Sequence, residues 1–382
     1  MIYLDYNATT PVAPDVLEAM LPFLREGYGN PSSSHMAGRS AREAIEGART
    51  HVAELIGACA EEIVFTSGGT EATNMALRGV VLGQPDRRHI VTSSFEHPAT
   101  AETCFLLEGQ GARVTRVGVA SDGRIRAEDV ARALDEEPAL VSVMHANNEI
   151  GTIQPIAEIS RLAKKKDAVV HTDAAQTLGK IPVDVDALGV DLLTIAGHKL
   201  CAPKGIGALY IRRDTALERL LAGAGHERGL RPGTENVAGI VALGKACEIA
   251  ERDLISEQMR LRGLRDHLLA KLRAAIDDLV LHGHATDRLP NTLFLSFPGV
   301  NGGRLLDAVP EIAASTGSAC HSGSNGACAS LLAIGVEPPQ AVGPVRLSLG
   351  RGTTVNEIEQ AAEMLAAAWR RLGATNRAPR LT

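Results

Sequence analysis

The chain has 382 residues, of which 45% are hydrophobic and 22% charged, and its formal net charge at pH 7 is −6. This composition is ordinary for a globular protein, and no apolar run approaches the roughly 20 residues that a membrane-spanning helix needs. The negative charge and the lack of a long basic block give no electrostatic indication of direct nucleic-acid binding. We therefore expect a small polar substrate or a protein partner, with no membrane and no nucleic acid.

The first ten residues, MIYLDYNATT, contain no basic segment followed by an apolar one. No signal peptide is visible, so a reducing cytoplasm is the expected location. The length exceeds that of one typical core and predicts two domains.

Short β-rich runs alternate with longer helical segments through the first two thirds of the chain. This alternation predicts an α/β fold with a mostly parallel sheet. Several runs end in polar or glycine-rich residues, which matters because ligands of open α/β sheets bind beyond the carboxyl ends of the strands. The runs are EIVFTS (62–67), RHIVTSS (88–94), RVTRVGV (113–119), LVSVMH (140–145), AVVHTDAA (168–175), LLTIAGHK (192–199) and GALYIRR (207–213).

A glycine-rich turn, FTSGGTEATN, follows the first run and contains Gly69 and Thr70. Glycine lets the backbone approach a ligand closely, and a helix N-terminus offers free amides, so the turn could hold a phosphate. An ordinary turn is the alternative. The nearest match to a dinucleotide fingerprint, GAGHER at 223–228, ends in arginine where the third glycine should stand, so we reject a dinucleotide site.

Two later runs end in residues that suit a pyridoxal phosphate site. Asp173 could pair with a protonated ring nitrogen, although an aspartate in this position is also a common helix N-cap. Lys199, after His198 in AGHK, could form a Schiff base with an aldehyde. Three strand ends thus offer a turn that could hold a phosphate, an acid and a lysine. Their combination favours this cofactor more than any one of them does.

Three further side chains could complete the site, each with a structural alternative. His97 could stack on a planar ring or be a hydrogen-bonded structural histidine. Asn148 could orient a carboxylate or form a turn. Arg346, on the predicted strand VRLSLG, could hold a substrate carboxylate with two donors or lie on an exposed edge.

A helical stretch at 236–276 predicts the connection to a second unit, which contains the run NTLFLSF at 291–297 and a terminal helix with Trp369. We expect a large domain at 15–250 and a small domain at 251–382 that also includes residues 1–14.

The segment ASTGSACHSGSNGACAS, residues 314–330, holds Cys320 and Cys328 among small residues that cannot bury a thiol. Seven residues separate the two cysteines, and His321 adjoins Cys320 too closely for easy chelation, so no metal site is expected. A mobile, reactive thiol is the remaining interpretation. The other cysteines are expected to act as small buried hydrophobic residues: Cys59, Cys104, Cys201 and Cys247.

Taken together, these segments resemble the NifS-like cysteine desulfurases and selenocysteine lyases of the class V aminotransferase group, which have the pyridoxal phosphate fold type I. The resemblance covers essentially the whole chain. It implies a large domain with a seven-stranded, mostly parallel sheet and a smaller α+β C-terminal domain. The motifs that carry it are YLDYNATTP, GNPSSSH, FTSGGTEATN, HANNEIGTIQP, HTDAAQTLGK, PKGIGALY, GHERGLRPGTEN, TGSAC and RLSLGRGTT.

The resemblance also implies a role for each candidate residue. Lys199 would bind the cofactor covalently and, once freed by substrate, move the Cα proton. Asp173 would pair with the ring nitrogen and Gln176 with the ring hydroxyl. His97 would stack on the ring. Gly69, Thr70 and His198 would hold the phosphate, with Thr234 reaching in from the second subunit of a homodimer. Asn148 and Arg346 would hold the substrate carboxylate, and Asn148 would also contact the cofactor. Cys320 would be the nucleophile, and with Lys199 and His97 it makes up the expected catalytic set.

The implied reaction converts L-cysteine to L-alanine, leaving a persulfide on Cys320 that passes to an acceptor protein. Selenocysteine lyase activity is the close alternative; an aminotransferase, which needs no thiol, and a non-catalytic scaffold are more distant ones. Housekeeping members carry serine where this chain has Ala196, so one phosphate hydrogen bond is expected to be missing. Cys328 has no counterpart, and it is either inert or able to resolve a persulfide.

Overall fold

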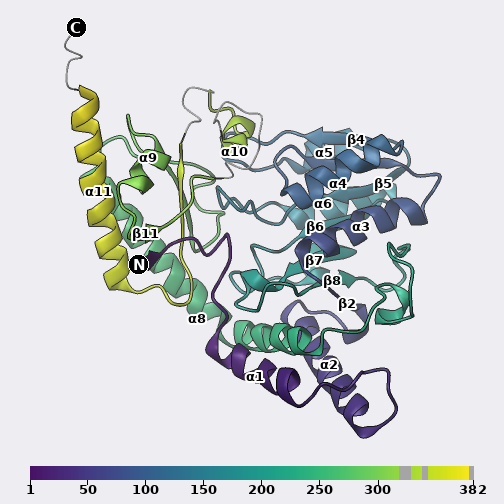
Figure 1. Cartoon of the computed structure of the whole chain (residues 1–382). Coiled ribbons are helices and arrows are strands. Elements are labelled where there is room, and N and C mark those ends of the chain that lie inside the picture. The colour runs from purple at the N-terminus through teal and green to yellow at the C-terminus, as the bar shows by residue number, and fades with distance from the viewer. Residues whose placement is uncertain (318–327, 338–342, 378–382) are drawn as a thin grey trace.

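The computed structural model describes residues 1–317, 328–337 and 343–377. Seven strands form the central sheet: β2 (Ile63–Thr66), β3 (His89–Ser93), β4 (Arg113–Val117), β5 (Pro138–Ser142), β6 (Val169–Asp173), β7 (Leu192–Ala196) and β8 (Gly207–Ile211). Their order is β2-β8-β7-β6-β5-β3-β4 (Figure 1). Neighbours from β7 to β4 are parallel, while β8 runs antiparallel to both β7 and β2. Each predicted β-rich run contains one of these strands, except that LVSVMH (140–145) covers only the end of β5, so the predicted α/β fold is confirmed.

Helices cover both faces of this sheet, because its strands alternate apolar side chains between two cores. On β2, Val64 belongs to one core, while Ile63 and Phe65 belong to the other. Helices α3 (Gly69–Gly83) and α4 (Pro98–Gly109) pack on the first core. The second core includes side chains from α2 (Met36–Leu55), α5 (Ala127–Ala133), α6 (Ile156–Ala163) and α7 (Val185–Leu188).

A smaller unit contains two further sheets. One has the antiparallel order β12-β10-β9, and the other pairs β1 with β11 in parallel. These strands and the accompanying helices are β1 (Ile2–Tyr3), β9 (Val280–Leu281), β10 (Thr292–Ser296), β11 (Ile312–Ala313), β12 (Val345–Ser348), α9 (Gly302–Asp307), α10 (Ala329–Ala333) and α11 (Val355–Arg377). Because β1 pairs with β11, the N-terminal residues Ile2 and Leu4 belong to the core of this unit.

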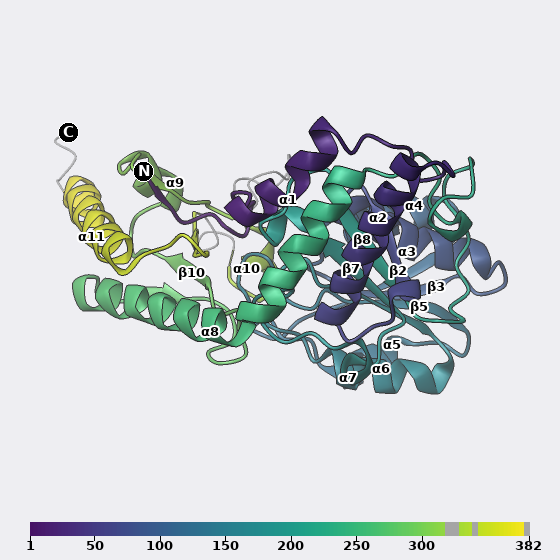
Figure 2. The same cartoon turned by 90° about the horizontal axis from the view of Figure 1, so that it is seen from below.

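One helix, α8 (Val237–Ala275), spans both units and has 39 residues. Figure 2 shows it beside α11 at one end and beside α2 and α1 (Pro14–Arg25) at the other. Ile240 packs in the core of the larger unit and Leu261 in that of the smaller one. The expected helical stretch at 236–276 is therefore confirmed. The domain division 15–250 and 251–382 stays a prediction, and its boundary falls inside α8.

Short 3-10 helices complete the described chain at Ala60–Glu62, Lys164–Lys166, Gly197–Lys199 and Glu227–Gly229. No helix among the described residues combines the length and apolar character needed to cross a membrane.

The expectation that four cysteines are buried was wrong in part. Cys104 and Cys247 are buried, and Cys201 is half-buried. Cys59 is exposed, because it lies on the surface connection between α2 and β2, where its N–H donates to the Glu62 carboxylate at 3.0 Å.

Candidate active site

A cavity of about 420 Å³ lies at the carboxyl ends of the parallel strands. Segments that follow β3, β5, β6 and β7 all contribute to its lining, as expected for a site in an open α/β sheet. The predicted site residues that line it are Gly69, Thr70, His97, Asn148, Asp173, Gln176, His198, Lys199 and Arg346.

Two predicted residues are not among those that line the cavity. Thr234 is exposed, and its predicted role in a neighbouring subunit stays a prediction. Cys320 lies outside the described residues, together with His321.

One end of the cavity is formed by the start of α3, whose first residue is Gly69. The preceding Gly68 has φ +151°, a conformation that residues with a Cβ rarely adopt. A Cβ added to Gly69 would lie 3.2 Å from the Cβ of Ala196, so the start of the helix packs closely on the end of β7. This geometry leaves free helix amides toward the cavity, which suits a phosphate.

His198 also lines the cavity, and its Nδ1 is 3.2 Å from the Thr9 hydroxyl. Burial, followed by the nearby Lys199, lowers the pKa of His198 to about 4. The imidazole is therefore neutral at physiological pH and would bind phosphate as a hydrogen-bond donor rather than as a cation.

Lys199 ends the 3-10 turn that follows β7. Its Nζ donates to the main-chain oxygens of Asn7, at 2.6 Å, and Ala8, at 2.7 Å. Burial, followed by the positive charge of Arg346, lowers the pKa of Lys199 to about 8, so a sizeable fraction is the free amine near neutral pH. A free amine is the form that attacks an aldehyde or removes a proton.

Asp173 is buried at the end of β6. Its Oδ1 accepts from the N–H of Ala175 at 2.9 Å and so caps a turn. In the described part of the chain Oδ2 accepts no hydrogen bond, and burial raises the pKa of the carboxyl group. A cationic ring nitrogen in the cavity would supply the missing partner.

His97 is the N-cap of α4, and its Nδ1 accepts from the N–H of Ala99 at 3.1 Å. This bond places the ring proton of a neutral His97 on Nε2. The side chain is exposed along the cavity, where its ring face is available for stacking.

Gln176 belongs to a buried polar network that the sequence did not predict. Its Nε2 donates to the main-chain oxygen of Asn7 at 3.0 Å, and its Oε1 accepts from Lys180 at 3.0 Å. The Asn7 side chain donates to Thr292 in β10 at 2.8 Å. Asn7 therefore connects the smaller unit to both Gln176 and Lys199. The motif YLDYNATTP contains Asn7, but nothing in its local pattern indicates these distant partners.

Arg346 lies in β12 and is 6% exposed. Its Nη1 donates to the main-chain oxygen of Asn148 at 3.1 Å, and its Nη2 donates to Asp5 at 2.8 Å and Ser315 at 3.2 Å. Within the residues described, its buried Nε has no hydrogen-bond partner. The guanidinium is thus held rigidly at the cavity with a donor unused. Asp5 is a second site residue that the sequence did not reveal.

The expectation that the segment 314–330 cannot bury a thiol was wrong for Cys328, which is buried because it packs against Phe294 and Leu331. Its Sγ is 3.4 Å from a carboxylate oxygen of Glu149. Burial, followed by the negative charge of Glu149, raises the pKa of this thiol to about 12. Since the thiolate is the reactive form, this environment favours the inert alternative over a persulfide-resolving role.

The chain is similar to known proteins over nearly its whole length. The family model described as aminotransferase class-V matches residues 2–361, and the chain therefore belongs to the class V aminotransferase family. A cysteine desulfurase IscS of Dictyoglomus turgidum is 47% identical over 367 residues, covering 95% of this chain and 93% of that protein. Among solved structures, a NifS-like protein superposes with a TM-score of 0.90 at 38% identity, covering 98% of this chain and 99% of that one. SspA in complex with cysteine gives a TM-score of 0.82 at 36% identity, covering 91% and 99% of the two chains.

These findings confirm the resemblance to NifS-like proteins and the fold type I architecture. Enzymes of this family use pyridoxal phosphate. The cavity fits that cofactor, since it combines amides at the start of α3, the Asp173 oxygen that has no partner among the described residues, and the amine of Lys199.

Proposed function

We propose that this protein is a pyridoxal phosphate-dependent cysteine desulfurase, which converts L-cysteine to L-alanine and collects the sulfur as a persulfide on Cys320. The observation that carries the proposal is the convergence of Lys199, Asp173 and Arg346 on one cavity. The relatives named cysteine desulfurase at 45–47% identity support the choice of reaction.

When bound, the cofactor withdraws electrons from the substrate Cα, so that the Cα–H bond and then the Cβ–S bond can break. Asp173 would keep the ring nitrogen protonated, and His97 would stack on the ring. Lys199 would remove the Cα proton and return a proton to the product, a role that its pKa of about 8 allows near neutral pH.

Arg346 and Asn148, which also line the cavity, would hold the substrate carboxylate. The Cys320 thiolate would attack the substrate sulfur, forming an S–S bond while the Cβ–S bond breaks with its electron pair toward carbon. Protonation of that carbon gives alanine, and Cys320 carries the sulfur as a persulfide.

The test is to incubate the protein, loaded with pyridoxal phosphate, with L-cysteine or L-selenocysteine and to follow alanine, sulfide and selenide. We expect alanine from cysteine and a persulfide on Cys320 by mass spectrometry, both lost in Cys320→Ala. Fast turnover of selenocysteine with little from cysteine would make the protein a selenocysteine lyase. An unaffected Cys320→Ala variant on both substrates would overturn the mechanism.

From the family resemblance we further propose that the enzyme works as a homodimer in the cytoplasm and passes its sulfur to an acceptor protein. In such a dimer Thr234 would serve the neighbouring site. An active monomer in light scattering would contradict the first of these points.

A further inference from the structure

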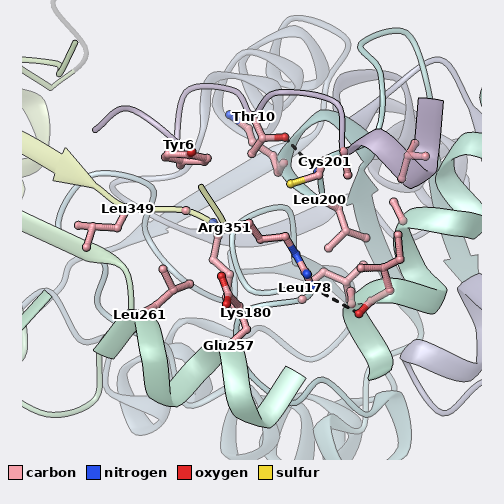
Figure 3. A pocket seen from close by; sticks show the side chains of 18 residues that line it. Tyr6, Thr10, Leu178, Lys180, Leu200, Cys201, Glu257, Leu261, Leu349 and Arg351 are labelled. Carbon is pink, nitrogen blue, oxygen red and sulfur yellow. Dashed lines mark hydrogen bonds between the residues drawn. The ribbon is translucent and has the colours of Figure 1, made fainter. Parts of the chain in front are cut away.

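Lys180 is a buried cation next to the site that the mechanism above does not use. It lies in the turn after β6 and is 7% exposed. It lines a second cavity, of about 50 Å³, which also includes Lys199, Tyr6 and Cys201 (Figure 3). Two lysines, from the turns after β6 and β7, therefore line one small cavity together with residues of the smaller unit.

No carboxylate forms an ion pair with Lys180 in the part of the chain that the structure describes. An unpaired buried charge is costly and is normally paired or neutralised. Burial, followed by the charge of Lys199, lowers the pKa of Lys180 to about 7. The other charged or titratable groups near it are Cys201 and Arg346, with Glu257, Arg351 and Tyr6 across the second cavity.

The hydrogen bonds of Lys180 give this buried amine a structural role. Its Nζ donates to Gln176 Oε1 at 3.0 Å and approaches Asn7 Oδ1 at 3.4 Å. In its ammonium form Lys180 can only donate, so in that form the amide oxygen of Gln176 faces it. The main-chain oxygen of Asn7 can only accept, so the amide nitrogen must face Asn7.

Both contacts select the same orientation of the Gln176 amide. One of its two N–H groups is bonded to Asn7, and the other has no partner among the described residues. Gln176 lines the active-site cavity, and Lys180 lies behind it, on the second cavity. Gln176 can therefore offer a donor, rather than an acceptor, to a group bound in the site.

We propose that Lys180 is a positioning residue that fixes the Gln176 amide so that an N–H is presented to the ring oxygen of bound pyridoxal phosphate. The inference rests on the proposed function, since it requires that cofactor. A donor stabilises the ionised form of the oxygen that it contacts and lowers its proton affinity. Lys180 thus acts on the ring through Gln176 and touches no reacting atom itself.

The experiment is a double-mutant cycle read out by absorbance. Native protein, Lys180→Met, Gln176→Leu and the double variant are loaded with pyridoxal phosphate, and the pH midpoint of the visible absorbance change is measured for each. Lys180→Met is expected to raise the midpoint by about one pH unit in the native background, the size expected for losing a hydrogen bond to a charged group. In the Gln176→Leu background, less than a third of that shift is expected, because the two residues act as one unit.

Equal shifts in both backgrounds, or no shift in either, would overturn the proposal, because Lys180 would then act independently of Gln176 or not at all. Lys271→Met removes an exposed lysine of α8 and is the matched control, with no shift expected. Lys180→Gln takes the place of Lys180→Met if the latter does not fold, and the same criterion applies. If the native protein binds no pyridoxal phosphate, the proposed function is contradicted. If the native protein binds the cofactor and turns over cysteine, but Lys180→Met leaves the pH midpoint unchanged, only this inference is contradicted.

Discussion

The guanidinium of Arg346 donates to the carboxylate of Asp5 at 2.8 Å, so the arginine proposed to bind substrate already has an anionic partner in its own chain. Asp5 is brought there by the N-terminal segment, which pairs with β11 in the smaller unit. A substrate carboxylate must share the guanidinium with Asp5. The pair therefore sets both the orientation of Arg346 and the net charge that the substrate meets.

Asp5→Asn is expected to strengthen substrate binding. The amide oxygen can still accept from Arg346, but the competing negative charge is gone. We expect the KM for L-cysteine to fall roughly fivefold, the effect of about 1 kcal/mol, with a smaller change in kcat. Steady-state kinetics at fixed pH test this, with Arg346→Ala as the opposite case, in which KM rises. An unchanged or higher KM in Asp5→Asn would show that Asp5 only holds the arginine in place.

Ala196→Ser is expected to improve cofactor retention. Ala196 lies beside the start of α3, where a hydroxyl would add a donor to a bound phosphate. A hydrogen bond to a charged group contributes about 1.5 to 3 kcal/mol, so the dissociation constant for pyridoxal phosphate should fall about tenfold or more. Equilibrium titration followed by absorbance measures it. Ala196→Gly, which adds no hydroxyl, is the control, and an equal gain in both variants would refute the explanation.

Glu96→Gln is expected to change how stability depends on pH. The Glu96 carboxylate accepts from the N–H of Met144 at 3.1 Å, and burial raises the pKa of Glu96 to about 8. Because this pKa is higher in the folded protein than in the unfolded chain, the stabilisation is complete below about pH 4.5 and is lost as the pH rises toward 8. We therefore expect Glu96→Gln to lose less stability than the native protein between pH 5 and 8.5. Parallel Tm curves for the two cofactor-free proteins would contradict this.

Glu227→Ala is expected to destabilise the fold strongly. The side chains of Glu227 and Arg49 are 4% and 7% exposed and are joined by hydrogen bonds of 2.8 and 2.9 Å. Removing the carboxylate leaves Arg49 buried without this partner, which costs about 3 to 5 kcal/mol. Urea unfolding measures the loss, and the Arg49→Met/Glu227→Leu pair should recover much of it. A loss below about 1 kcal/mol in Glu227→Ala would mean that water or Glu46 compensates Arg49.

Cys328→Ala is expected to leave sulfur transfer intact. The thiol is buried beside Glu149 with a pKa of about 12, so it supplies almost no thiolate at neutral pH. We expect turnover within about twofold of native and a loss of stability of about 1 kcal/mol from the small cavity. A persulfide that accumulates on Cys320 without reaching an acceptor in this variant would restore the resolving role.

The sequence predicted the residues that depend on strand order better than those that depend on long-range packing. Asp173 and Lys199 follow directly from runs that end at one edge of a parallel sheet. Asn7 and Asp5 could not be inferred in this way, because their partners lie roughly 140 to 340 residues away and are set by the pairing of β1 with β11. Cys59 was assigned to a core because thiols are usually buried, but its place in a connecting segment decided otherwise.

The helix α8 has a consequence for how the protein denatures. At 1.5 Å per residue its 39 residues extend about 58 Å. Its N-terminal half contributes side chains to the core of the larger unit, and its C-terminal half contributes side chains to the core of the smaller one. Unwinding of this helix from its centre would expose apolar surface in both units at once. Melting of the cofactor-free protein should therefore follow one cooperative calorimetric peak, with neither unit surviving as a folded fragment after the other is lost.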